Sequence, residues 1–463
     1  MLKLYNALTN SITDFVPAGK VATMYYCGPT VYSTQHIGNM RAFFVMDTIR
    51  RAIMYNGIPV ESVMNITDVG HLTSDADTGD DKMLVASQRE HRTPTEIANY
   101  YTNICLNDMK ELNILTPTHI EKATNVIPEI IDFVQTLIKN GYAYETPKGI
   151  YYDVSKFADY GKLSGVKLED KLAGARIEVD EDKRHPADFA LWVKAPENHI
   201  MKWESPWGLG YPGWHIECSA ICYKFFGDSV DLHGGGIEHK TIHHENEIAQ
   251  NYGRAGKEVV HRWLHHEHLM VDGGKMSKSL GNVWNLQTLK QKGFRPLDLR
   301  YFFLNAHYAK QQNFTLNELA SSNTALTKLY KQTLLNKNGT DEVADEVIAD
   351  FDNRFLSAIN DNLNCPQALG IVWELVKLPQ KSPKIYKLLL KFDEVLGLDL
   401  QNAEKHLAED TLELGSDIKE LAEKRWQAKK DKNFALADSL RDELAQKGYK
   451  ILDSKDGYKI EKL

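Results

Sequence analysis

Two short strings, far apart in the chain, carry residue types suited to binding a nucleoside triphosphate. They are HIGN at residues 36–39 and KMSKS at residues 275–279. Gly38 has no Cβ, so a nucleotide can lie close to the backbone there, and His36 can donate hydrogen bonds to developing phosphate charge. The two lysines of the second string follow a glycine pair, which suits a triphosphate and its pyrophosphate leaving group. The first string alone is a weak signal, whereas the second specifies five residues.

A helix is expected directly after the first string. Apolar residues recur with helical spacing over residues 42–49. The N-terminus of a helix carries partial positive charge, so we expect this one to face the phosphates. The alternative is a surface histidine before an ordinary helix, together with a solvated basic turn, and it requires both strings to be accidental.

Four further residues could form a metal site, namely Cys27, Cys218, His243 and Glu247. His243 and Glu247 are four positions apart, so on a helix they share one face. Two thiolates, one imidazole and one carboxylate suit tetrahedral zinc. The spacing is not that of a zinc finger, since it contains no Cys-x-x-Cys pair. From the residues alone, two buried structural cysteines and a solvated polar helix remain an open alternative.

Taken together, the two strings resemble the ATP signatures of class I aminoacyl-tRNA synthetases. The segments around the candidate metal ligands resemble the cysteinyl-tRNA synthetase family, and they are CGPT at 27–30, GWHIECS at 213–219 and HHENEIAQ at 243–250. This resemblance runs in family order from about Val21 to Thr315. It implies ATP-dependent activation of L-cysteine, with Mg²⁺ accompanying ATP, and transfer of cysteine to tRNA(Cys).

The resemblance also implies roles for individual residues. The residues implied to hold ATP and to act in catalysis are His36, Gly38, Asn39, Lys275 and Lys278. The implied ligands of one Zn²⁺ per chain are Cys27, Cys218, His243 and Glu247. A thiophilic metal separates cysteine from serine better than shape can, because it prefers a thiolate to a neutral hydroxyl. The candidate contacts to the amino acid are Trp214, Thr67 and His233. For Trp214 a core position is an equal alternative.

We expect an α/β fold with a Rossmann-like parallel sheet, an inserted connective segment, and an all-α C-terminal region that ends in a small subdomain. The expected divisions are a first catalytic half (1–119), a connective insertion (120–204), a second catalytic half with the zinc ligands (205–265), a lysine-signature and stem-contact region (266–315), a helical bundle (316–400) and a tRNA anticodon-recognition region (401–463). The glycine-rich run at 208–214 is expected to return the chain to the parallel sheet.

Two segments depart from the family pattern. An acidic insertion at 70–79 separates NITDV at 65–69 from DDK at 80–82. A calcium loop is disfavoured there, because its glycine falls one place early and Ala86 stands where a closing glutamate belongs. We therefore expect a solvated loop near the active-site mouth. Near the C-terminus, many relatives have a tryptophan soon after the glycine that matches Gly457, whereas this chain continues with Tyr458. This difference concerns anticodon contacts rather than catalysis.

Composition and charge narrow the class of protein. The 463 residues suggest about two to four domains. Five cysteines without disulfide-like spacing indicate a reducing cytoplasm, and no signal-peptide pattern or membrane-crossing stretch is evident. A net charge of −8 argues against nonspecific nucleic-acid binding, so a tRNA partner requires a local basic surface. We expect a monomer whose partners are tRNA(Cys), L-cysteine and ATP.

Two other functions are compatible with parts of this pattern. A ligase that joins cysteine to an amino sugar, as in mycothiol synthesis, shares adenylation and zinc. The long helical region after the lysine string favours tRNA instead. An inactive synthetase-like RNA-binding protein has no chemical need for intact signatures and a complete ligand set.

Overall fold

The computed structural model describes residues 1–70, 82–165, 182–197, 199–276, 282–412, 416–453 and 457–462. Lys278 and nearly all of the acidic insertion, both singled out from the sequence, lie outside these ranges. Within the described ranges, no helix combines the length and the apolar character needed to cross a membrane.

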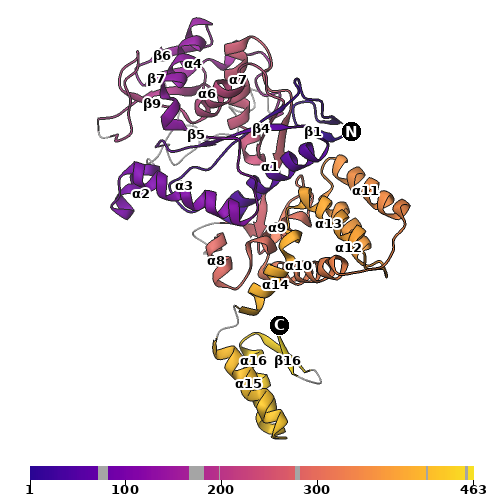
Figure 1. The fold of residues 1–463 in the computed structure, drawn as a ribbon. Helices are drawn as coiled ribbons and strands as arrows, with labels where there is room; N and C mark the ends of the chain where they lie inside the picture. The colour runs from indigo at the N-terminus through magenta and orange to yellow at the C-terminus, as the bar shows by residue number, and fades with distance from the viewer. Residues whose placement is uncertain are drawn as a thin grey trace.

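A five-stranded parallel sheet forms the centre of the N-terminal half (Figure 1). In spatial order its strands are β11 (Trp263–His266), β10 (Leu232–Gly236), β3 (Ala22–Tyr26), β4 (Val60–Ile66) and β5 (His119–Lys122). Every neighbouring pair is parallel, which confirms the predicted α/β class. The chain runs outward from β3 to β5 in one direction and from β10 to β11 in the other. The strand order therefore switches between β3 and β10, and ligands bind at such switch points.

Helices cover both faces of this sheet. The helices α1 (Ile37–Tyr55) and α3 (Pro94–Glu111) lie on one side, and α6 (Trp214–Phe226) and α7 (His243–Ala255) on the other (Figure 1). Because successive strand residues point to opposite faces, neighbours on β3 enter different apolar cores. Met24 and Tyr26 belong to the core shared with α1, whereas Tyr25 belongs to the core shared with α6.

The connective insertion is built on its own antiparallel sheet. Its strands are β6 (Ala143–Thr146), β7 (Gly149–Tyr152), β8 (Phe189–Lys194) and β9 (Gly210–Pro212). The expectation that the glycine-rich run returns the chain to the parallel sheet was wrong, because that run forms β9 and pairs with β8. A Cβ on Gly213 would lie 2.0 Å from the carbonyl oxygen of Ala190, so the glycine permits a close approach to β8. The chain leaves the insertion only where α6 begins.

The C-terminal region is helical, as predicted. The bundle consists of α10 (Leu316–Lys337), α11 (Asp345–Asn360), α12 (Cys365–Val376) and α13 (Pro383–Leu396), followed by α14 (Ala403–Leu412). The terminal subdomain contains α15 (Ser416–Lys430), α16 (Phe434–Gln446), β15 (Tyr449–Asp453) and β16 (Tyr458–Lys462). It has a small apolar core of its own, made by Ile418, Ala422, Leu444 and Ile451.

The remaining elements connect these parts. They are β1 (Lys3–Asn6), β2 (Ser11–Asp14), α2 (Lys82–Glu90), α4 (Ile127–Lys139), β12 (Leu269–Val271), β13 (Gly274–Lys275), α8 (Leu286–Gln291), α9 (Pro296–Leu304) and β14 (Gln312–Phe314). The strands β13, β12 and β14 form a small sheet that carries the start of the lysine string.

Candidate nucleotide and metal site

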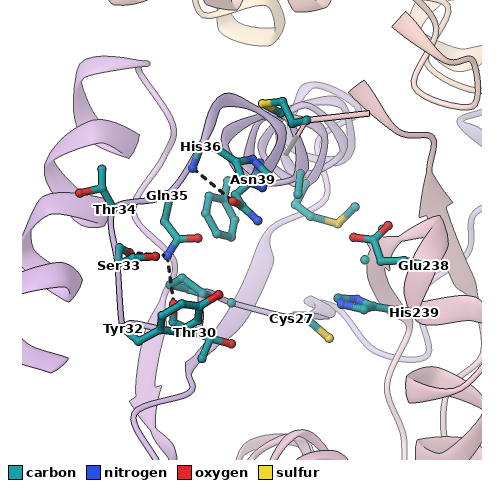
Figure 2. A pocket seen from close by; sticks show the side chains of 18 of the residues that line it. Cys27, Thr30, Tyr32, Ser33, Thr34, Gln35, His36, Asn39, Glu238 and His239 are labelled. Carbon is teal, nitrogen blue, oxygen red and sulfur yellow. Dashed lines mark hydrogen bonds between the residues drawn. The ribbon is translucent and has the colours of Figure 1, made fainter. Parts of the chain in front are cut away.

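A cavity of about 390 Å³ opens at the carboxyl ends of β3 and β10 (Figure 2). Its walls include the turn after β3 (residues 27–30), the first turns of α1 and the glycine triplet 234–236. This is the switch point of the sheet, where ligands bind in open α/β folds. The volume lies in the range of small-molecule sites. The cavity is therefore the candidate substrate site.

His36 and Asn39, predicted from the first string, both line the cavity and form a capping box at the start of α1. The main-chain N–H of Asn39 donates to Nδ1 of His36 at 3.2 Å, and the main-chain N–H of His36 donates to Oδ1 of Asn39 at 3.2 Å. Because Nδ1 accepts, a neutral His36 ring carries its proton on Nε2. The predicted helix begins here, and its N-terminal end is the wall of the cavity.

Gly38 joins the two strings in space. A Cβ at this position would lie 3.0 Å from the His36 ring and 3.0 Å from Cε of Met276. Met276, from the second string, also lines the cavity. Lys275 ends β13, where its backbone pairs with Met270 of β12. The described part of the second string therefore lies against the first.

The four predicted metal ligands come together in one cluster. The donor atoms of Cys27, Cys218, His243 and Glu247 all lie within 4.8 Å of one another. Cys27 follows β3, Cys218 lies on α6, and His243 and Glu247 lie on the first turns of α7. Cys218, His243 and Glu247 are buried, while Cys27 is half-buried and also lines the cavity.

The chemistry of this cluster fits a divalent cation. Both carboxylate oxygens of Glu247 are buried, and neither makes a hydrogen bond of good geometry to the described residues, although Oε1 lies 3.1 Å from Nε2 of His243. Burial raises the pKa of Glu247 well above its usual range. A buried carboxylate in this state requires a cation or a proton, and two sulfurs, a nitrogen and an oxygen are a donor set suited to zinc. Nδ1 of His243 lies 2.9 Å from Nδ1 of His215, a contact that orients the ring and leaves Nε2 toward the cluster.

A second donor set overlaps the first. The donor atoms of Cys27, His233, His244 and Glu247 also lie within 4.8 Å of one another. Nε2 of His244 is 3.4 Å from Sγ of Cys27, and Nε2 of His233 is 3.7 Å from Oε2 of Glu247. Burial lowers the pKa of both histidines well below the usual value, so both rings are neutral. His233, predicted to contact the amino acid, thus lies beside the metal cluster, and sequence reasoning missed His244 although it adjoins His243.

The two other predicted substrate contacts lie near the cluster. The ring of Trp214, at the start of α6, lies 4.6 Å from the ring of His243. Thr67 is buried, and its hydroxyl donates to Oε2 of Glu217 at 3.1 Å and accepts from Nδ2 of Asn65 at 3.0 Å. Asn65 in turn accepts from the main-chain N–H of Gly28 at 2.7 Å. Thr67 therefore ties the turn after Cys27 to α6, a role that sequence reasoning did not assign.

The cavity also has lining residues that were not selected from the sequence. Glu238 and His239, from the segment after the glycine triplet, face His36 and Asn39 across the cavity (Figure 2). Burial lowers the pKa of His239 to about 3, so this ring is neutral at physiological pH. Gln35 donates to the carbonyl oxygens of residues 30 and 33 and shapes the turn before α1. These residues could have been found from the sequence, because Gln35 directly precedes the first string and Glu238 and His239 closely follow the glycine triplet.

Comparisons with known proteins identify relatives of this chain. A family model described as tRNA synthetases class I (C) catalytic domain matches residues 14–324. The chain is 40% identical over 487 residues to the cysteine–tRNA ligase of Treponema denticola, with 98% of each protein covered. It is 40% identical over 483 residues to that of Chlorobaculum tepidum, again with 98% of each covered. Among solved structures, Mycobacterium tuberculosis methionyl-tRNA synthetase in complex with methionyl-adenylate is similar with a TM-score of 0.57 at 15% identity, covering 83% of this chain and 91% of that one. This last similarity concerns the fold alone.

Proposed function

Because the chain belongs to the cysteine–tRNA ligase family of class I aminoacyl-tRNA synthetases, we propose that it activates L-cysteine with ATP and transfers the cysteinyl group to tRNA(Cys). In the first step the cysteine carboxylate attacks the α-phosphate of ATP, giving cysteinyl-adenylate and pyrophosphate. In the second step a terminal ribose hydroxyl of the tRNA attacks the activated carbonyl and releases AMP. One observation carries the proposal: Cys27 belongs both to the cavity wall and to the metal-ligand cluster. A nucleotide in the cavity is thus a neighbour of an amino acid whose sulfur reaches the cluster.

The residues of the two strings act by positioning and by stabilising phosphate charge. The Nε2–H of His36, the side-chain amide of Asn39 and the N-terminus of α1 meet the nucleotide phosphates. Lys275 and Lys278 neutralise the pyrophosphate as it leaves, and Mg²⁺ accompanies ATP. No side chain forms a covalent bond to the substrate, so the rate depends on holding the carboxylate and the α-phosphate in line.

Zinc is the metal that the donor cluster fits best, held by Cys27, Cys218, His243 and Glu247. When bound, it supplies a thiophilic site that prefers the thiolate of cysteine to the hydroxyl of serine, so that selectivity needs no editing domain. The chain prepares this site through three contacts. His215 orients His243, Trp214 lies against the His243 ring, and Thr67 ties the turn after Cys27 to α6.

We propose that residues 1–119 and 213–265 are the catalytic halves, 266–315 the stem-contact region, and the bundle with the terminal subdomain the part that binds tRNA. The pairing of β9 with β8 supports ending the connective insertion near Pro212 rather than at residue 204. Matches over 98% of two cysteine–tRNA ligases include the whole helical region, which supports tRNA over an amino sugar as acceptor. A monomer in the cytoplasm is part of the same proposal.

The test is cysteine-dependent ATP–pyrophosphate exchange, followed by charging of purified acceptors. We expect exchange with cysteine, far weaker exchange with serine, and charging of tRNA(Cys). A glucosaminyl-inositol is the control acceptor, because it distinguishes the mycothiol-type reaction. Transfer of cysteine to the sugar with no charging of tRNA would refute the proposed acceptor while leaving the adenylation chemistry intact.

A further inference from the structure

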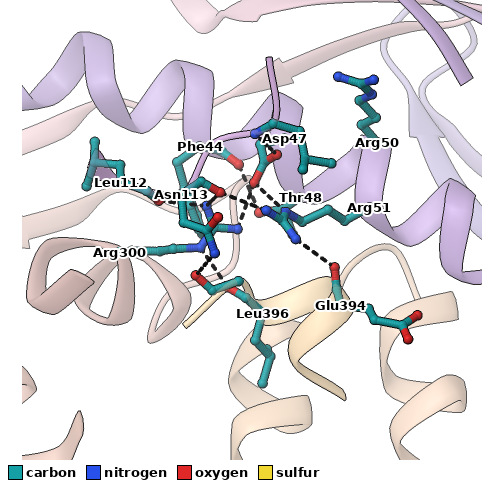
Figure 3. A network of polar contacts seen from close by, with 12 residues as sticks. Phe44, Asp47, Thr48, Arg50, Arg51, Leu112, Asn113, Arg300, Glu394 and Leu396 are labelled. Carbon is teal, nitrogen blue, oxygen red and sulfur yellow. Dashed lines mark hydrogen bonds and ion pairs between the residues drawn. The ribbon is translucent and has the colours of Figure 1, made fainter. Parts of the chain in front are cut away.

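A buried network of charges lies in the C-terminal half of α1 (Figure 3). Asp47 on α1 accepts hydrogen bonds from two arginines through the same oxygen, from Nε of Arg51 at 2.8 Å and from Nη2 of Arg300 at 2.7 Å. The second oxygen of Asp47 accepts from the main-chain N–H of Leu115 at 2.9 Å. All three charged side chains are buried or nearly so. The network therefore joins α1 to α9, which carries Arg300 and leads into the bundle.

Both arginines also hold the C-terminal ends of two helices. Arg300 donates to the carbonyl oxygens of Leu112, at the end of α3, and of Leu396, at the end of α13, at 3.0 and 2.7 Å. Arg51 donates to the carbonyl oxygens of Asn113 and Glu394 at 2.7 and 2.9 Å. Helix C-termini leave carbonyls without partners and carry roughly half a negative charge each. Two guanidinium groups are thus balanced by the Asp47 carboxylate, by two helix ends and by the nearby buried carboxyl of Asp393 on α13.

The backbone at the end of α13 is shaped to admit Arg300. Gly397 follows α13 in a left-handed conformation, with φ of +65°. A Cβ at this position would lie 2.5 Å from Nη2 of Arg300, so any side chain would displace the guanidinium. The side-chain amide of Asn113 donates to the Gly397 carbonyl at 2.9 Å and joins the ends of α3 and α13 directly. The close approach of the ends of α3 and α13 therefore depends on Gly397, Arg300 and Asn113.

The helix α1 is held at its other end as well. Arg41, one turn into α1, donates to the carbonyl oxygen of Lys310 at 2.9 Å and to that of Glu267. Asp47 lies eleven residues after His36, or roughly 16 Å along the axis. Two separated anchors fix the direction of a rigid helix, whereas one anchor allows it to pivot. The direction of the α1 axis therefore depends on the Arg41 contacts and on the Asp47 network. The position of the capping box in the cavity depends on them in turn.

We propose that Arg300 is a positioning residue for the nucleotide site, and that it acts through Asp47 to hold α1 and its His36–Asn39 capping box in line with the cavity. Buried ion pairs contribute little net stability compared with well-packed apolar groups, so their value lies in orientation. This inference rests on the proposed function, which identifies the nucleotide as ATP and the reaction as adenylation. It also means that the bundle, proposed to bind tRNA, is rigidly joined to the helix that meets ATP.

The test compares Arg300→Lys with Arg295→Lys. A lysine at 300 keeps the positive charge but loses the forked set of donors that reaches Asp47 and both helix ends together. Arg295, just before α9, pairs with Asp298 at 2.7 Å and with Thr327 of α10 at 2.9 Å, so it is a matched control on the same helix. For Arg300→Lys we expect the kcat of pyrophosphate exchange to fall by roughly 10- to 100-fold with an unchanged KM for cysteine. For Arg295→Lys we expect wild-type kinetics even where the Tm falls.

A second readout does not depend on the reaction. Calorimetric ATP binding without cysteine is expected to weaken in Arg300→Lys and not in Arg295→Lys. If the wild-type protein shows no cysteine-dependent exchange, the proposed function fails, and the ATP affinities still decide the role of Arg300. A folded Arg300→Lys with wild-type exchange and wild-type ATP affinity would overturn the inference. Should Arg300→Lys not fold, Arg51→Lys, which gives up the Nε contact to Asp47 and the two carbonyl contacts, is judged by the same two criteria.

Discussion

Nε2 of His243 lies 3.1 Å from Oε1 of Glu247, one helical turn further along α7. The four-residue spacing brings an imidazole and a carboxylate to one face of the helix, and this face is buried against α6. Burial raises the pKa of the Glu247 carboxyl well above its usual range, so the carboxylate form needs a positive partner. The pair is explained once two cysteine sulfurs stand beside it, because four donors then surround a space suited to a metal ion.

Loss of Cys218 is expected to remove the metal. Purified protein should contain about one zinc per chain, and Cys218→Ser should lose both zinc and cysteine activation, because a hydroxyl is a poor substitute for a thiolate ligand. Metal analysis by mass spectrometry measures the content. Cys222→Ser is the matched control, since Cys222 is buried one turn along α6. Zinc retained in Cys218→Ser but lost in His244→Ala would assign the metal to the overlapping donor set.

Removal of Lys278 is expected to slow adenylate formation. We propose that the second lysine of the KMSKS string meets the charge that develops on the leaving pyrophosphate, so Lys278→Ala should reduce the single-turnover rate by roughly two orders of magnitude. Cysteine affinity should change much less, because the amino acid is proposed to be held by the metal cluster instead. An unchanged adenylation rate would remove Lys278 from the mechanism.

The two roles of His36 can be separated by two variants. His36→Ala loses the cap of α1, at a cost of about 1 kcal/mol of stability, and also loses the imidazole donor. His36→Asn restores a good helix cap but not the donor, so its Tm should return toward wild type while pyrophosphate exchange stays slow. Thermal unfolding and exchange assays on the same samples provide the comparison. Recovery of exchange together with Tm would show that His36 acts only as a cap.

Acid is expected to loosen the terminal subdomain through Asp453. Hydrogen bonds from Arg425, and then from Lys429, lower the pKa of this carboxyl to about 2, below the unfolded value of about 3.9. A lowered folded pKa means that the ion pair stabilises the subdomain fully above about pH 4, and that this contribution is lost as the pH falls toward 2. The contribution is about 1 kcal/mol or less, because the pair is partly exposed.

Hydrogen exchange of the β15–β16 amides at pH 7 and pH 3 tests this assignment. Asp453→Asn should reduce protection at pH 7 and flatten its pH dependence. Asp442→Asn, which changes an exposed carboxylate on α16, should leave both unchanged. Equal pH dependence in the wild type and in Asp453→Asn would show that another group controls the subdomain.

Removal of the terminal subdomain is expected to separate adenylation from charging. A cut near Lys337 would remove α13, whose end is held by Arg51 and Arg300. A chain that ends after α14, at Leu412, keeps that contact and should retain pyrophosphate exchange. It should lose most tRNA charging, because remote contacts position the acceptor end. Charging by the full chain should also weaken as salt rises. Undiminished charging by the shortened chain would contradict the assigned recognition role.

The sequence by itself determined the local features of this protein. The helix predicted directly after the first string begins at Ile37, and the C-terminal region is helical as expected. These predictions succeeded because side-chain periodicity and capping are properties of neighbouring residues. The four candidate metal ligands were also identified from the sequence, but through a family resemblance rather than through their spacing.

Only the tertiary structure decided which distant groups meet. Cys27 and Cys218 become neighbours because the parallel strands β3 and β10 place the turn after β3 beside α6 and α7, and no local pattern encodes that contact. His244 enters the cluster for the same reason. No sequence pattern distinguishes Arg300 from other charged residues on helices. In the structure it is buried between two helix ends and Asp47. The physical reason is that burial and long-range pairing depend on how elements pack, and packing is a property of the whole chain.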